Sequence, residues 1–200
     1  MKNAVAIAAL AAVALALGLG LWQWQQSGGG RELAAATRLD RPRPLPEVQL
    51  LDQNGDRFGR SGFEGRWHLL FFGFTHCPDI CPNTLGLLKQ VRRALDEPRL
   101  RIVFISLDPK RDTPARLREY AGYFDPEFLA LTGEEAQLQK LSKALYMPYA
   151  VTQPDAAGNY SVDHSANLVL LNPAAQVVAY FSAPHEAAAV TVDLWKLMTP

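Results

Sequence analysis

The chain has 200 residues, 48% of them hydrophobic, and its 20 basic and 20 acidic side chains balance to a net charge of zero. This length is enough for one compact domain with a tail, and it argues against two ordinary domains. The balanced charge argues against a nucleic-acid-binding surface, which would show as an excess of Lys and Arg. Two cysteines are too few for a disulfide framework or a zinc-finger array.

The N-terminal segment has the pattern of a membrane anchor. Residues 4–22 carry no charged side chain and are rich in Ala, Leu and Val. At a rise of about 1.5 Å per residue, a helix of this length would span close to the ~30 Å hydrocarbon core of a bilayer. Trp22 and Trp24 at its end suit the membrane interface. We therefore predict a single transmembrane helix within an anchor that covers residues 1–26.

A cleaved signal peptide is the alternative for the same segment. Ala-x-Ala patterns occur at 12–14 and 14–16, but they lie inside the apolar run and not beyond it. An uncleaved anchor would leave Lys2 in the cytoplasm and export the rest of the chain, although Arg31 and the arginines after it argue against this orientation. Because no transit peptide is evident, we predict a single-pass protein of a bacterial inner membrane, with its soluble domain in the periplasm or another extracytoplasmic space.

A flexible linker is predicted between the anchor and the folded domain. The sequence SGGG at 27–30 is a flexible spacer, and the proline-rich stretch 41–46 lacks apolar periodicity. We therefore assign residues 27–44 to the linker and residues 45–200 to the folded domain.

The folded domain opens with a β-hairpin and then alternates strand-like and helix-like patterns. Thr113 and Pro114 form an N-cap and first-turn pair, and Thr132 with Glu135 predicts a capping box. This order indicates an α/β fold with a central mixed sheet, partly parallel, flanked by helices. The expected strands are a hairpin at 48–52 and 57–58 joined by Asn54-Gly55, then 69–74, 101–107, 128–131, 160–162, 168–171 and 177–181, and the expected helices are 82–95, 114–124, 135–145 and 190–197.

Both cysteines lie where the first central strand gives way to a helix. Three residues separate Cys77 from Cys81, and Pro82 suits the first helical position, so we expect Cys81 at the N-cap. A disulfide between them would close almost no loop and would stabilise the fold little. The pair is therefore suited to redox chemistry or to a soft metal ion. Thioredoxin-like folds place a reactive cysteine pair at this point, which is an analogy at the level of fold.

A metal held by two thiolates would need a further ligand, and the chain offers four histidines. His68 is expected to pack within a strand, His76 to point away from its cysteine neighbour, and His185 to be solvated near a helix start. His164 lies in a polar stretch before an apolar strand, and the neighbouring Asp163 is a candidate to orient its ring. From the residues alone, both a structural role and a ligand role stay open for His164.

Three motifs follow one another along the chain. They are FTHCPDICP at 74–82, SLDPKRDTP at 106–114 and VDHS at 162–165. In this order and spacing they resemble the Sco/SenC family of copper chaperones for cytochrome c oxidase assembly, from about Leu45 to the C-terminus. In the second motif, support of the loop and of a helix cap is favoured over partner recognition as the role of Asp108 and Asp112.

The resemblance implies a membrane-anchored, thioredoxin-like domain that binds copper through Cys77, Cys81 and His164. The expected ion is Cu(I), with Cu(II) as a second form, because Cu(I) accepts thiolate and imidazole at low coordination number. The implied partner is cytochrome c oxidase subunit II, to whose dinuclear copper site the protein would deliver copper or whose cysteines it would first reduce. Other copper chaperones or thiol reductants are further expected partners.

The main alternative is an extracytoplasmic thiol-disulfide oxidoreductase that uses Cys77 and Cys81 catalytically. The spacing is one residue wider than the Cys-x-x-Cys redox motif, and no proline immediately precedes the strand after His164, which argues against this function. A peroxidase on the same fold is disfavoured because no arginine adjoins Cys77. We therefore expect a metallochaperone and not primarily an enzyme, with thiol-disulfide reductase activity as the open question.

Overall fold

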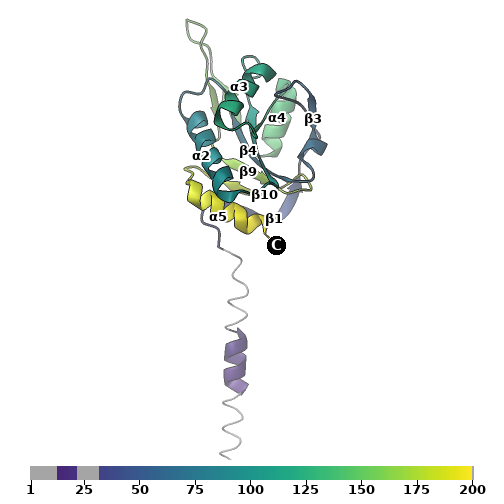
Figure 1. Cartoon of the computed structure of the whole chain (residues 1–200), viewed down its shortest axis with the longest axis vertical. Helices are drawn as coiled ribbons and strands as arrows, with labels where there is room; N and C mark the ends of the chain where they lie inside the picture. Colours follow the sequence, from purple (N-terminus) through teal and green to yellow (C-terminus); the bar gives the residue numbers. More distant parts are fainter. Residues whose placement is uncertain (1–12, 22–31, 200) are drawn as a thin grey trace, which may run out of the picture. The chain divides into compact units, whose positions relative to one another are not determined.

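The computed structural model describes residues 13–21 and 32–199 (Figure 1). The chain divides into two compact units, residues 1–33 and residues 34–200. Residues 13–21 are helical, and a search of the described residues finds no helix with the length and apolar character needed to cross a membrane. The remainder of the predicted anchor and the glycine-rich start of the linker lie outside the described residues.

The second unit contains an eight-stranded mixed sheet with the strand order β1-β10-β9-β4-β5-β6-β2-β3. Strands β4, β5 and β6 run parallel to one another, and all other neighbours in the sheet are antiparallel. Two short strands, β7 and β8, form a separate antiparallel sheet. The strands are β1 Ala36–Pro44, β2 Gln49–Asp52, β3 Arg57–Gly59, β4 Trp67–Gly73, β5 Leu100–Ser106, β6 Leu129–Thr132, β7 Tyr149–Val151, β8 Val162–His164, β9 Leu168–Leu171 and β10 Gln176–Phe181.

Helices α2 (Ile80–Leu95) and α3 (Pro114–Phe124) connect the three parallel strands. Parallel crossovers are almost always right-handed, so two successive connections in the same direction place both helices on one face of the sheet. Helix α5 (Ala187–Met198) packs beside α2, and α4 (Glu135–Ala144) contacts β2 (Figure 1). A 3₁₀ helix, Arg60–Phe63, follows β3. This arrangement confirms the predicted mixed sheet with flanking helices and the N-terminal hairpin.

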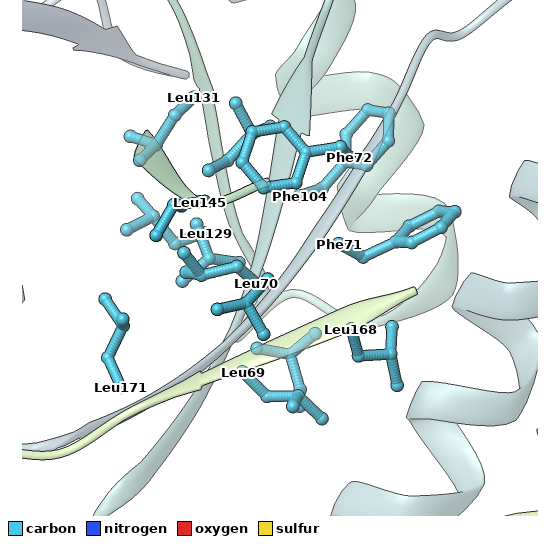
Figure 2. Packing of buried hydrophobic residues seen from close by; sticks show 14 of the residues in the cluster. Leu69, Leu70, Phe71, Phe72, Phe104, Leu129, Leu131, Leu145, Leu168 and Leu171 are labelled. Atoms are coloured by element: carbon cyan, nitrogen blue, oxygen red, sulfur yellow. The ribbon is translucent and has the colours of Figure 1, made fainter. Parts of the chain in front are cut away.

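The hydrophobic core is centred on β4 (Figure 2). The strand lies between β9 and β5, and the side chains of Leu69, Leu70, Phe71 and Phe72 are completely buried. A strand covered on both faces needs apolar residues at consecutive positions, not at alternating ones. The continuous apolar run in the sequence therefore predicted both the strand and its central place.

Strand β1 at the edge of the sheet occupies much of the predicted linker. It pairs antiparallel with β10, with Ala36 opposite Phe181, and its register shifts between Arg38 and Arg43. Proline lacks a backbone N–H, but an edge strand tolerates it on the side that has no neighbour. The linker prediction is therefore wrong for residues 36–44, because the partner strand lies near the far end of the sequence and leaves no local signal.

Two helix starts test the predicted caps. The Thr113 hydroxyl accepts the N–H of Arg116 at 3.3 Å, which confirms the N-cap of α3. The capping box predicted for α4 is wrong, because the N-cap is Glu134 and Thr132 ends β6 with its side chain buried. Thr132 is needed by the sheet, where it lies opposite Leu51 of β2. Strand β7 was not predicted, because its three residues are too short to show a period.

Candidate metal centre

The two cysteines lie on either side of the start of α2. Helix α2 begins at Ile80 with Asp79 as its N-cap, so the prediction that Cys81 is the N-cap is wrong by two residues. Cys81 and Pro82 lie in the first turn, where proline is tolerated because the first N–H groups of a helix have no partner within it. One of these groups, the N–H of Cys81, instead points to the sulfur of Cys77 at 3.5 Å.

Gly73, the last residue of β4, makes room for the buried thiol. A Cβ atom at this position would lie 2.7 Å from Sγ of Cys81, closer than real Cβ contacts, and 3.0 Å from Cε2 of Phe104, which is tighter than most of them. Cys81 can therefore pack directly over the end of the strand. Its side chain is completely buried, whereas Cys77 is half-buried, and both thiols are free.

Asp112 holds the backbone between β4 and Cys77. Its carboxylate is completely buried and accepts the N–H of Thr75 at 2.9 Å, the hydroxyl of Thr75 at 2.6 Å and the hydroxyl of Ser106 at 2.6 Å. These three donors compensate for burial of the charge. Asp112 thus ties the cysteine loop to the end of β5, in agreement with the loop-supporting role predicted for it.

His164 approaches the cysteines from a distant part of the chain. Its Nε2 lies 3.5 Å from Sγ of Cys81, which is 83 positions away in the sequence. Its Nδ1 lies 2.9 Å from the carbonyl oxygen of Ser165. A carbonyl only accepts, so this contact assigns the proton to Nδ1 and leaves the lone pair of Nε2 directed to the thiols. The rings of Phe71 and Phe74 meet the imidazole edge-on at 6.2 and 6.0 Å between centroids.

Burial affects the protonation of the buried thiol and of the imidazole in opposite directions. Removal from water raises the pKa of the Cys81 thiol, and the neighbouring Cys77 raises it further. The same desolvation lowers the pKa of His164, although its bond to Ser165 and the charge of Asp163 act in the opposite direction. His164 is therefore neutral at neutral pH, which is the form that binds a metal, and a cation binding to Cys81 would displace the thiol proton.

The three predicted ligands come together. Sγ of Cys77, Sγ of Cys81 and one imidazole nitrogen of His164 all lie within 4.8 Å of one another. Asp163 does not orient the imidazole by a hydrogen bond, because the ring bonds to Ser165 and Asp163 is exposed. The prediction of Asp163 as the orienting residue is therefore wrong, since the backbone carbonyl next to the histidine already performs this role.

The other histidines do not join this group. His68 is completely buried within β4, as predicted. His76 is half exposed and directs Nδ1 to the hydroxyl of Thr75 at 3.2 Å. His185 was expected to be solvated, but it is half-buried, and its Nε2 lies 2.8 Å from the carbonyl of Ala166.

A second group of possible ligand atoms comprises His76, Asp108 and Asp112. Both carboxylates already accept bonds from protein donors: Thr75 and Ser106 donate to Asp112, and Arg111 and Tyr160 donate to Asp108. A metal would have to break these buried bonds, which is costly. This group therefore supports the surrounding loops. Two thiols with one imidazole form a better metal site, because they match soft ions such as Cu(I).

The model of the SCO1/SenC family matches residues 39–199. The chain belongs to this family. A relative from Stutzerimonas stutzeri, provisionally named a copper-binding protein, is 44% identical over 149 residues, which are 73% of this chain and 72% of the relative. The residues of this chain that match the family model therefore run from β1 through the cysteine loop to the end of α5.

Solved structures of family members share the fold. The structure of Arabidopsis thaliana ScoI with copper bound is 31% identical, with a TM-score of 0.71 over 76% of this chain and 96% of that chain. The structure of Bradyrhizobium japonicum ScoI with copper bound is 34% identical, with a TM-score of 0.69 over 76% of this chain and 98% of that chain. These matches confirm the thioredoxin-like fold of the family that the motifs predicted.

Proposed function

We propose that the chain is a copper-binding assembly factor for cytochrome c oxidase, in which Cys77, Cys81 and His164 hold Cu(I). The observation that carries the proposal is the convergence of two sulfurs and one imidazole nitrogen within 4.8 Å of one another. Cu(I) favours thiolate and imidazole ligands, whereas structural zinc would usually take four ligands. Two relatives have been solved with copper bound, which supports copper as the metal.

Within oxidase assembly, the proposed destination is the dinuclear copper site of subunit II. The protein would either deliver copper to this site or first reduce the cysteines of that subunit. Cys77 and His164 are half-buried while Cys81 is completely buried. A recipient ligand would therefore first replace Cys77 or His164, and Cys81 would release the ion last. Other copper chaperones or thiol reductants would load or reduce the site.

The proposed location is the bacterial inner membrane, with the copper-binding domain in the periplasm. It is supported by the uncharged residues 4–22, which follow Lys2. We expect the full chain to stay in the membrane fraction after alkaline carbonate extraction. Protease added to spheroplasts should digest the domain, and protection of the domain until the membrane is lysed would contradict this orientation.

Anaerobic Cu(I) titration of the reduced full chain in competition with a chelator tests the ligand set. We expect about one tightly bound Cu(I) per chain and a large loss of affinity in Cys77→Ala, Cys81→Ala and His164→Ala. His76→Ala is the matched control, because His76 adjoins Cys77 but lies outside the ligand group. Unchanged affinity in His164→Ala would remove the imidazole from the proposed site.

The same thiols should make binding depend on redox state. Oxidation would remove two protons and two electrons from the pair and join Cys77 to Cys81, leaving no thiolate for the ion. The oxidised chain should therefore bind Cu(I) no better than the Cys77→Ala/Cys81→Ala double variant. Tight binding by fully oxidised protein would contradict the ligand assignment.

Thiol-disulfide reduction is the second candidate function, favoured by the partial exposure of Cys77 beside a buried second thiol. The sulfur of Cys77 would attack a partner disulfide, and Cys81 would then displace the partner from the mixed disulfide. One partner disulfide would be reduced as the Cys77–Cys81 disulfide forms. Undiminished reduction of a disulfide substrate by His164→Ala, together with weak Cu(I) binding by the unaltered chain, would favour this function.

A further inference from the structure

The hairpin that carries His164 is attached to the rest of the domain by few polar contacts. Strands β7 and β8 pair only with each other among the described strands. Val162 is buried in the core, and the rings of Phe71 and Phe74 pack against His164. Apart from the bond of His164 to its neighbour Ser165, four polar contacts involving side chains join residues 149–164 to other parts of the described chain. These are Tyr149 to Glu135, Tyr160 to Asp108, Arg111 to the carbonyl of Tyr160, and His164 to Cys81.

Two of these four contacts converge on one cluster, formed by Asp108, Arg111 and Tyr160. The hydroxyl of Tyr160 donates to Oδ1 of Asp108 at 2.8 Å, and Nε of Arg111 donates to Oδ2 of the same carboxylate. Nη1 of Arg111 donates to the carbonyl of Tyr160 at 3.1 Å. The guanidinium also lies 3.6 Å from the centroid of the Tyr160 ring. Each member of the cluster therefore contacts both others.

The cluster lies between the two halves of the proposed metal site. Asp108 and Arg111 belong to the loop that also contains Asp112, whose carboxylate holds the backbone before Cys77. Tyr160 lies two residues before β8, the strand that ends at His164. The guanidinium of Arg111 lies 5.9 Å from the ring of Phe74, which in turn packs against the imidazole. One short loop thus contacts both the cysteine side and the histidine side.

The composition of the cluster suits a rigid attachment. Asp108 is 3% exposed, and a buried carboxylate needs charged or polar donors at both oxygens. Arginine provides a planar fork for the carboxylate and a flat face for the tyrosine ring, which lysine cannot reproduce. The geometry therefore fixes the entry of β8 relative to the loop, without any of the three residues reaching the ligand atoms.

We infer that the Asp108–Arg111–Tyr160 cluster positions His164 over the two cysteines and thereby sets the affinity and release rate of the ion. The inference rests on the proposed copper function and adds to it a positioning role for Arg111. Residues that orient a metal ligand from outside the coordination sphere typically change metal affinity about 10- to 100-fold when replaced. The cluster acts through His164, so its effect should vanish when the imidazole is absent.

A double-mutant cycle with Cu(I) competition tests this inference. Arg111→Lys in the full chain should weaken Cu(I) binding about 10-fold, through faster release, because the fork and the stacking are lost. In a His164→Ala background the same replacement should leave Cu(I) affinity unchanged. Tyr160→Phe, which loses only the hydroxyl, should show a smaller loss with the same dependence on His164. Arg116→Lys is the matched control, because Arg116 is an exposed arginine of the adjoining helix α3.

Each outcome of the cycle is decisive. An equal loss of affinity with and without His164 would mean that Arg111 supports the fold in general, and would overturn the inference. Unchanged affinity in Arg111→Lys and Tyr160→Phe would also overturn it, while tight binding by the unaltered chain would leave the copper function intact. Broadened imidazole NMR signals of His164 in folded Arg111→Lys are the expected sign of lost positioning, and unchanged signals would contradict it.

Discussion

The two sides of the proposed metal site are built differently. Both cysteines follow β4, which lies between two neighbours in the eight-stranded sheet and contributes a run of completely buried side chains. His164 ends β8 in a separate two-stranded sheet, where Val151 of the partner strand is 49% exposed. The cysteine side therefore follows a buried central strand. The histidine side is held by a few polar contacts, by one buried side chain of β8, Val162, and by the rings of Phe71 and Phe74 against the imidazole.

This difference indicates that the two sides of the proposed site differ in how easily they can move. Cys81 is part of the core, so its position depends on the stability of the whole domain. The histidine can be displaced by breaking a small number of contacts, which costs less than opening a core. A protein that must hold an ion and then release it benefits from one firm side and one movable side. Perturbations of the core should therefore change global stability, and perturbations of the hairpin should change ligand affinity alone.

The largest expected effect is on the core side. Phe72→Ala should lower the free energy of unfolding by about 3–5 kcal/mol, because it removes a large, completely buried ring from the central strand. Val151→Ala in the hairpin should change it by about 0.5 kcal/mol or less, since that side chain is half exposed. Urea unfolding followed by circular dichroism measures both. Similar losses for the two variants would contradict the division into a firm and a movable side.

The next effect concerns His68, which lies in β4 with neither ring nitrogen hydrogen-bonded within the described part of the chain. Burial, followed by the nearby charge of Arg101, lowers the pKa of His68 to about 4, although the backbone of Arg66 acts in the opposite direction. In the unfolded chain, His68 gains a proton near the ordinary pKa of about 6.5, whereas in the folded chain it stays neutral down to about pH 4. The free energy of unfolding should therefore be highest above about pH 6.5 and should decrease as the pH falls towards 4. The expected contribution is at most about 3 kcal/mol.

Urea unfolding between pH 7.5 and 5 measures this dependence. His68→Phe should flatten the curve over this range, because the buried ring then has no proton to gain on unfolding. His76→Gln is the matched control, since His76 is half exposed. If the unaltered chain and His68→Phe lose stability with the same slope, the buried histidine is not the source of the pH dependence.

A smaller effect should separate ligand position from stability on the cysteine side. Gly73→Ala would place a methyl group 2.7 Å from Sγ of Cys81, so the sulfur must move. We expect weaker Cu(I) binding and a loss of about 1–3 kcal/mol in the free energy of unfolding from overpacking. Gly86→Ala in α2 is the control, because a methyl group there meets no atom within 4 Å and should stabilise the helix by about 0.5–1 kcal/mol. Unchanged Cu(I) affinity in Gly73→Ala would show that the sulfur has room to adjust.

Much of the architecture could be predicted from local patterns. The apolar run of β4, the Thr113-Pro114 start of α3 and the amphipathic face of α2 appear where the sequence places them. These features depend on interactions between residues a few positions apart, or on burial that requires apolar residues at defined intervals. The cysteine pair could be located for the same reason, since it follows directly from the end of a buried strand.

The tertiary structure alone decided the features that join distant segments. Strand β1 forms because β10 offers an edge. The N-cap of α2 falls at Asp79, two residues before the predicted position, and the N–H of Cys81 points to the sulfur of Cys77 in the preceding loop. The motifs pointed to His164, but only the packing of β8 beside the cysteine loop shows its nitrogen 3.5 Å from a sulfur. Local sequence determines backbone propensity and burial pattern, whereas the contacts that complete a metal site lie between residues whose proximity is created by folding.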